Sequence, residues 1–216
     1  MASTSLSGPE LAPRSGSVKR AVIFLHGYGS NGDDLLGLAP LMDLPDTQFL
    51  APNAPFPFEF YPGGYQWFGL ADRDPARILR EIIVAAPILN AFIDATMLRF
   101  GLTEENIALI GFSQGSMMSM YTALRRAKPL AGVVAISGAL KGDDALAAEI
   151  QSRPPICIIH GEADEVVAFG EMAHAEKILK ANNVPVETHA RPRLGHGIDE
   201  VGIDIANAFL VKAFGI

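Results

Sequence analysis

The sequence has little cysteine and no segment typical of export or membrane insertion. Cys157 is the single cysteine among 216 residues, so the chain cannot form an internal disulfide. The N-terminal stretch is rich in Ser, Pro and Gly and lacks the apolar core of a signal peptide. No uninterrupted apolar run reaches the ~18 residues of a membrane span. We therefore expect a cytoplasmic protein without stable membrane insertion, in which Cys157 is a buried thiol.

An excess of positive charge is also missing. The net charge is −7 and the isoelectric point is near 5.2, with no basic stripe along any segment. A general attraction to nucleic acid or to anionic lipid is therefore excluded. Spacings of metal ligands such as H-x-x-x-H and C-x-x-C do not occur, so no metal site is predicted. What the chain does have is 49% hydrophobic residues, enough for one domain with a full core.

Short apolar runs rich in β-forming residues alternate with segments of helical periodicity. Strands are expected at 21–25, 48–51, 107–111, 132–137, 156–160 and 186–190. Helices are expected from 33 or 34 to 42, and at 74–100, 114–127, 143–150, 171–181 and from 198 or 199 to 214. This alternation predicts an α/β fold with a mostly parallel sheet and helices on both faces.

Two further expectations concern the organisation of the chain. Residues 1–17 are predicted to be a flexible N-terminal segment, and residues 18–216 a single α/β domain. Pro87 stands inside the long helical pattern and is expected to kink or divide that helix, because proline lacks the N–H that the helix needs.

The strongest chemical pattern is Gly111-Phe112-Ser113-Gln114-Gly115, a G-x-S-x-G sequence between an expected strand and an expected helix. That context is the one a nucleophile elbow requires. A serine on such a turn needs small neighbours, and glycine stands on both sides. The turn also places Ser113 at a helix N-terminus, where backbone N–H groups stabilise negative charge. We predict Ser113 as a nucleophile; the alternative is an ordinary serine in a glycine-lined turn.

A nucleophilic serine needs a base, and the best candidate is His196. It stands between two glycines, after the last expected strand and before the last helix. In a fold with this kind of elbow the chain order is serine, acid, histidine, which excludes His26. His160 ends a strand, but no acidic residue follows an intervening strand to orient it. The remaining histidines lie inside a helix and a strand respectively: His174 and His189.

The acid should follow the strand that precedes the base. Asp164 lies four residues past the end of that strand and is followed by two valines that can anchor the loop. An acid there must reach the imidazole Nδ1 and hold its tautomer. Asp164 is therefore the predicted acid, with Glu162 as the alternative.

Hydrolysis also needs donors for the oxyanion. One is the backbone N–H after the nucleophile, on Gln114, and the other is expected on Tyr28, in the glycine-rich loop after the first strand. His26 in the same loop is expected to hydrogen-bond and shape it. Residues 27–32 also match the dinucleotide pattern G-x-G-x-x-G, but a lone match of this kind is weak.

These residues are also the ones by which the chain resembles the phospholipase/carboxylesterase family, which includes acyl-protein thioesterases. The matching segments are Val22–Gly29, Ala51–Pro55, Gln66–Phe68, Ile110–Gly115, Ile159–Val167 and Gly195-His196. They occur in family order over nearly the whole chain, and together they are far more specific than any one motif.

The resemblance implies an α/β-hydrolase fold without a large cap domain, and an enzyme that needs no cofactor. It implies Ser113, Asp164 and His196 as the triad. It also implies that the N–H groups of Tyr28 and Gln114 are the oxyanion donors. It also implies that the loop carrying Trp67 and Phe68 borders the acyl pocket and binds substrate, although composition alone would make Trp67 a packing residue. Two positions depart from the family pattern. Ser116 replaces a second glycine that is common after the elbow, and Tyr28 replaces a leucine common in the eukaryotic thioesterases.

The sequence therefore predicts a serine carboxylesterase for short- to medium-chain esters, with lysophospholipids and acyl thioesters as close variants. The partner is a small-molecule ester, and the protein is a monomer or a homodimer. A dienelactone-hydrolase-like enzyme on the same fold and a non-catalytic binding protein stay open as alternatives, because a fold does not fix a substrate.

Overall fold

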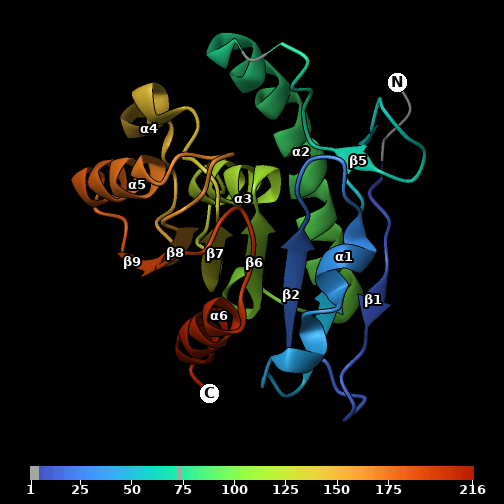
Figure 1. The fold of residues 1–216 in the computed structure, drawn as a ribbon. Helices are drawn as coiled ribbons and strands as arrows, with labels where there is room; N and C mark the ends of the chain where they lie inside the picture. The colour runs from blue at the N-terminus through green and yellow to red at the C-terminus, as the bar shows by residue number, and fades with distance from the viewer. Residues whose placement is uncertain (1–4, 73) are drawn as a thin grey trace.

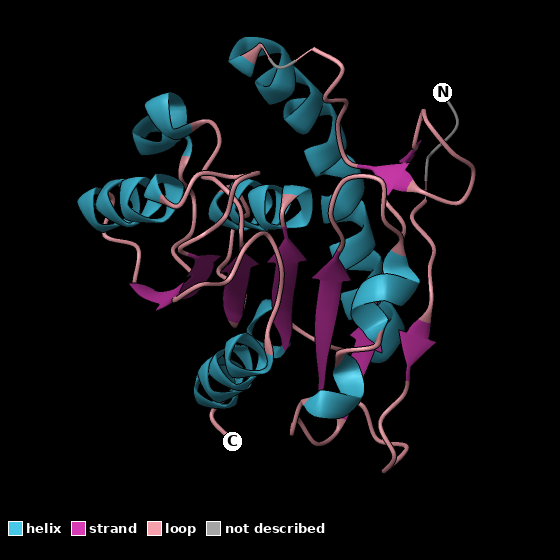
Figure 2. Ribbon diagram, in the orientation of Figure 1, coloured by secondary structure: helices cyan, strands magenta, loops and turns pink. Residues whose placement is uncertain are grey.

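The computed structural model describes residues 5–72 and 74–216, and a seven-stranded sheet runs through its middle (Figures 1 and 2). The strand order is β1-β3-β2-β6-β7-β8-β9. The strands are β1 (Glu10–Leu11), β2 (Arg20–Leu25), β3 (Thr47–Leu50), β6 (Ile107–Phe112), β7 (Gly132–Ile136), β8 (Ile156–Gly161) and β9 (Val186–Arg191). β1 is antiparallel to β3, and the other neighbouring pairs are parallel. The prediction of a mostly parallel sheet is confirmed.

Helices cover both faces of this sheet, as predicted. They are α1 (Gly32–Leu36), α2 (Pro75–Phe100), α3 (Gln114–Leu124), α4 (Asp143–Glu149), α5 (Gly170–Ala181) and α6 (Glu200–Phe214), with short 3-10 turns at Ala39–Leu41 and Glu104–Asn106. One core lies under α2, α3, α4 and α5 and contains Ile23, whereas α1 and α6 pack on the other core, which contains Val22. Successive side chains of a strand point to opposite faces. Strands buried on both faces therefore read as continuous apolar runs.

Helix α2 continues through Pro87 as one element, so the predicted division does not occur. The Asp74 side chain accepts a hydrogen bond from Arg77 N at the start of α2, and Gly101, with φ 66°, ends the helix. Pro87 leaves the carbonyl of Ile83 without its helical donor. Both residues are exposed, so water can satisfy that carbonyl. An exposed position lowers the cost of a proline inside a helix.

The same helix is the one element of the described chain that is long and apolar enough to cross a membrane, with a mean hydropathy of 1.6 over its most apolar window. The expectation from uninterrupted apolar runs missed it, because charged residues divide its sequence. In this fold α2 buries Ile82, Leu89 and Ile93 in the core that contains Ile23. That packing is what a core helix of an α/β domain requires.

Two small strand pairs were not predicted. β1 lies inside the segment expected to be flexible and pairs with β3, while Leu6 just before it is buried. The domain boundary at residue 18 stays a prediction. A second, two-stranded sheet joins β4 (Phe56–Pro57) to β5 (Tyr65–Gln66) in the aromatic loop. Its Tyr65 exchanges backbone hydrogen bonds with Gly29 and Ser30, which ties the aromatic loop to the loop after β2.

Candidate active site

Ser113 stands between β6 and α3 in the conformation that a nucleophile elbow requires. Its φ of 55° and ψ of −115° lie where a non-glycine residue is strained. A Cβ on Gly111 would lie 2.3 Å from the Gly115 carbonyl oxygen, and one on Gly115 would lie 1.8 Å from the Leu25 carbonyl oxygen. The backbone crosses itself too closely here for any side chain. The structure thus has the predicted strand, turn and helix, and both glycines are needed sterically.

Asp164 and His196 meet at the carboxyl end of β8. His196 Nδ1 lies 2.8 Å from Asp164 Oδ2, and the amides of Val166 and Val167 donate to Asp164 Oδ1 at 2.9 Å each. Burial works to raise the pKa of Asp164, but hydrogen bonds from His196 and from the Val167 and Val166 amides hold it below its usual value. An ionised carboxylate fixes the His196 tautomer with the proton on Nδ1, leaving Nε2 as the basic nitrogen. Asp164, rather than the exposed Glu162, contacts the histidine.

Three features bring His196 over the serine turn. Gly161 at the end of β8 lets the His196 loop pass closely, since a Cβ there would lie 2.3 Å from the Leu194 carbonyl oxygen. An ion pair of 2.9 Å between Arg191 and Asp199 joins the end of β9 to the N-cap of α6 and so brackets that loop. The rings of His196 and Phe112 have centroids 4.9 Å apart. Phe112 directly precedes Ser113, so this contact holds the imidazole near the serine turn.

A groove of about 760 Å³ opens at this edge of the sheet, and both Ser113 and His196 line it. Aromatic and aliphatic side chains make much of its wall, among them Tyr28, Phe60 and Leu70. Asp34 is the one carboxylate in the lining, which contains no lysine or arginine among the described residues. The groove therefore suits an uncharged, apolar acyl group near the serine.

Trp67 and Phe68 do not line this groove, in contrast to the expectation that they bind substrate. Trp67 is 0% exposed and Phe68 is 1% exposed, and both belong to the core under α2 and α3. The Trp67 indole N–H donates to the His26 carbonyl at 3.0 Å, which holds the ring inward. Tyr28, Phe60 and Phe112 are the aromatic residues of the groove wall.

The Gln114 side chain has a role that the sequence did not indicate. Its Oε1 accepts from Trp67 N at 3.1 Å, and its Nε2 donates to Phe68 O at 2.7 Å. Gln114 thus fastens the aromatic loop to the first residue of α3. Its own backbone N–H belongs to the first turn of the helix, where N–H groups lack intrahelical acceptors. Tyr28, the other expected donor, lies in the groove wall near Ser113.

His26 shapes the loop after β2, as expected. Its Nε2 accepts from Ala54 N at 2.9 Å, so the ring proton is on Nδ1, which donates to Gly27 O at 2.8 Å. Burial lowers the pKa of His26, although the Gly27 hydrogen bond works in the other direction. A neutral buried imidazole therefore joins the glycine-rich loop to the start of the aromatic loop.

His160, which the chain order does not favour as a base, lies beside Asp164. Its Nε2 is 3.3 Å from Asp164 Oδ2 and 2.9 Å from the Val167 carbonyl oxygen. No pattern in the sequence indicates this contact, because the two residues are separated by a turn rather than by a strand or helix.

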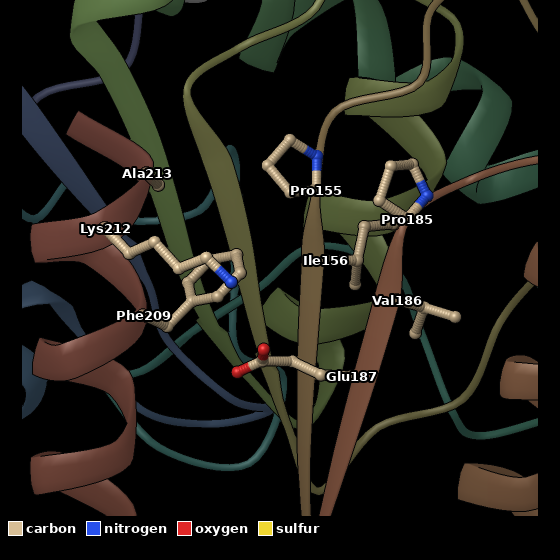
Figure 3. A pocket seen from close by; sticks show the side chains of 8 residues that line it. All are labelled: Pro155, Ile156, Pro185, Val186, Glu187, Phe209, Lys212 and Ala213. Carbon is tan, nitrogen blue, oxygen red and sulfur yellow. The ribbon is translucent and has the colours of Figure 1, made fainter. Parts of the chain in front are cut away.

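A smaller cavity of about 380 Å³ lies at the opposite, amino-terminal end of β8 and β9 (Figure 3). Ligands of parallel α/β sheets bind at the carboxyl ends of the strands, so this is not the expected place for a substrate. Glu187 in its lining belongs to a group with Cys157 and His189 whose ligand atoms lie within 4.8 Å of one another. Burial, the largest cause, raises the pKa of the Cys157 thiol far above its usual value. Cys157 is thus the buried thiol that the sequence predicts.

Comparisons with known proteins show the family to which this fold is similar. The family described as phospholipase/carboxylesterase matches residues 7–214. The crystal structure of esterase PE8 is 39% identical and superposes with a TM-score of 0.93, covering 97% of this chain and 99% of that one. Acyl-protein thioesterase 1 homolog 1 of Dictyostelium discoideum is 28% identical over 88% of this chain and 89% of its own length. A probable inactive carboxylesterase of Oryza sativa subsp. japonica is 26% identical over 93% and 86%.

Proposed function

The chain belongs to the phospholipase/carboxylesterase family of ester hydrolases, and we propose that it hydrolyses short- to medium-chain carboxylic esters through a Ser113–His196–Asp164 triad. The observation that carries this proposal is the 2.8 Å contact between His196 Nδ1 and Asp164, in a groove that Ser113 and His196 line together. A strained serine, an acid and a base in this chain order are the parts of a covalent hydrolase.

The proposed reaction has two displacements. Ser113 Oγ attacks the acyl carbonyl as His196 Nε2 takes its proton, and Asp164 stabilises the imidazolium. The backbone N–H groups of Tyr28 and Gln114 stabilise the oxyanion. This accelerates the reaction, because that charge develops only in the transition state. The leaving alcohol or thiol takes the proton from His196. Water then attacks the acyl-enzyme by the same route and frees the acid.

The groove supports uncharged acyl esters as the substrate class. Its aromatic and aliphatic wall favours an acyl chain, and the carboxylate of Asp34 disfavours an anionic group near the opening. Lysophospholipids and acyl thioesters are the close variants. The cytoplasmic location, the absence of a cofactor and the monomeric or dimeric state stay predictions.

A series of p-nitrophenyl esters from acetate to palmitate tests this proposal. We expect turnover with an optimum at short or medium length, and a long-chain optimum would overturn the substrate ranking. Hydrolysis of lactones without hydrolysis of simple esters would favour the dienelactone-hydrolase alternative. A relative described as inactive makes one further control necessary: labelling by a fluorophosphonate probe. Failure of both turnover and labelling would contradict the proposal and support a non-catalytic protein.

A further inference from the structure

His160 is a buried histidine at the end of β8 that the proposed triad does not use. Its side chain has no exposed surface, and its Nε2 lies 2.9 Å from the Val167 carbonyl oxygen. A carbonyl oxygen can only accept, so Nε2 carries the proton. The same Nε2 lies 3.3 Å from Asp164 Oδ2, a close contact without the geometry of a hydrogen bond. The imidazole therefore donates to Val167 while it lies against the carboxylate.

Val167 is held on both sides by this pair of side chains. Its N–H donates to Asp164 Oδ1 at 2.9 Å, and its carbonyl accepts from His160. The loop that carries the acid is thereby closed back onto the strand from which it leaves. Asp164 Oδ1 accepts from the Val166 and Val167 amides, and Oδ2 accepts from His196 at 2.8 Å. These three donors fix the plane of the carboxylate.

The surroundings of the ring leave Asp164 as its one charged partner in the described part of the chain. Phe169 packs edge-on with a centroid distance of 6.1 Å, and Ala190 is the β9 neighbour of His160. Nδ1 is buried and has no hydrogen-bond partner in the described residues. Asp164, and through it His196, are the titratable groups that the ring can influence.

We propose that His160 is a positioning residue: it holds the Val167 carbonyl, so that the Val167 N–H and the carboxylate that it binds keep their orientation toward His196. This inference rests on the proposed triad. It assigns a role in the reaction to a second histidine that touches neither the substrate nor Ser113.

A matched pair of variants separates the effect of the N–H donor from the effect of the ring's volume. His160→Gln can place an amide N–H near the position of Nε2, whereas His160→Met has similar length and no donor. We expect His160→Met to lower kcat about tenfold to a hundredfold with little change in KM, as for a buried carbonyl left without its hydrogen bond. His160→Gln should recover most of that loss. If His160→Met does not fold, His160→Asn replaces it, since its amide is too short to reach Val167 O.

The pH profile and a double variant distinguish positioning from mere packing. A carboxylate that is less well oriented should stabilise protonated His196 less, so the acidic limb of kcat/KM should move to lower pH in His160→Met. In an Asp164→Asn background, His160→Met should cost much less than it does alone, because both act through one carboxylate. Equal losses in the two backgrounds with an unmoved acidic limb, or an unchanged kcat, would reject the role of His160.

A readout without substrate keeps this test separate from that of the proposed function. The downfield NMR resonance of the His196 Nδ1 proton should be present in the wild type and in His160→Gln, and broadened or lost in His160→Met. Absence of ester turnover in the wild type would reject the proposed function while this comparison still decides the contact. A resonance identical in all three proteins would overturn the positioning role.

Discussion

Strands β6 and β7 end in the same local geometry but lead to different surroundings. Each is followed by a serine with positive φ, 55° at Ser113 and 49° at Ser137. Each serine donates its backbone N–H to a carbonyl of the next strand at 2.9 Å, Ile136 and Ile159 respectively. The two turns are thus consecutive steps along the carboxyl edge of one parallel sheet.

The two serines differ in the segment that comes after them and in their access to solvent. Ser113 begins helix α3 and lines the groove, where the helix N-terminus can stabilise charge. Ser137 is fully buried, and its hydroxyl has no partner among the described residues. A strained serine at a strand end is therefore not enough for a nucleophile. It also needs a helix that starts at the serine and a groove open to the substrate.

The largest expected effect is a difference in turnover between variants of the two serines. Ser113→Ala should reduce ester turnover by roughly 10⁶-fold, the scale of nucleophile loss in a serine hydrolase of another fold. Ser137→Ala should keep wild-type turnover, because its side chain does not reach the groove. Parallel kcat measurements on both variants check this. Residual activity of Ser113→Ala within tenfold of wild type would exclude Ser113 as the nucleophile.

The end of β8 extends the comparison to a third strand and gives the next largest effect. Asp164→Asn should lower kcat by roughly 10⁴-fold, because the amide holds His196 in the wrong tautomer. Glu162→Gln, the matched change at the alternative acid, should leave kcat unchanged. The pKa of Asp164 is lowered, so its contribution to stability exists above the usual Asp value and is lost as the pH falls through the lowered pKa. A larger loss of kcat in Glu162→Gln than in Asp164→Asn would reverse the assignment.

The smallest of the three effects concerns the backbone of the serine turn. Gly115→Ala places a Cβ 1.8 Å from the Leu25 carbonyl oxygen, so we expect destabilisation of about 3 kcal/mol or more. Gly170→Ala at the start of α5 meets nothing within 4 Å and should stabilise the fold by about 0.5–1 kcal/mol. Chemical denaturation of both variants measures the free energy of unfolding. Equal stability of the two would show that the turn has room to relax.

The central strands were predictable because both of their faces are buried. β2, β6, β7 and β8 begin and end within one residue of the expected positions, since a run that is apolar throughout marks a strand covered on both sides. β1 and the β4–β5 pair are two-residue strands. Long-range pairing stabilises them and a local pattern does not, so the sequence contains little signal for them.

For the candidate site, the sequence indicated the contact between two residues better than it indicated their surroundings. The contact between Asp164 and His196 could be expected from chain order and loop position. Trp67 and Phe68 were misplaced, because an aromatic loop next to a groove has the same composition whether its rings point inward or outward. The contact of His160 with Asp164 was not predicted, because a contact across a turn depends on backbone geometry and follows no residue spacing.

The proposed site is assembled from three loops far apart in the chain, and this has a consequence for folding. Ser113 takes its place when β6 pairs with β7, Asp164 when β7 pairs with β8, and His196 when β8 pairs with β9. Each parallel pairing closes a long loop before its contacts compensate the lost chain entropy, which slows such folds. In a refolding experiment, recovery of hydrolysis therefore reports the last of these pairings, whereas fluorescence of Trp67 reports its burial in the core under α2 and α3.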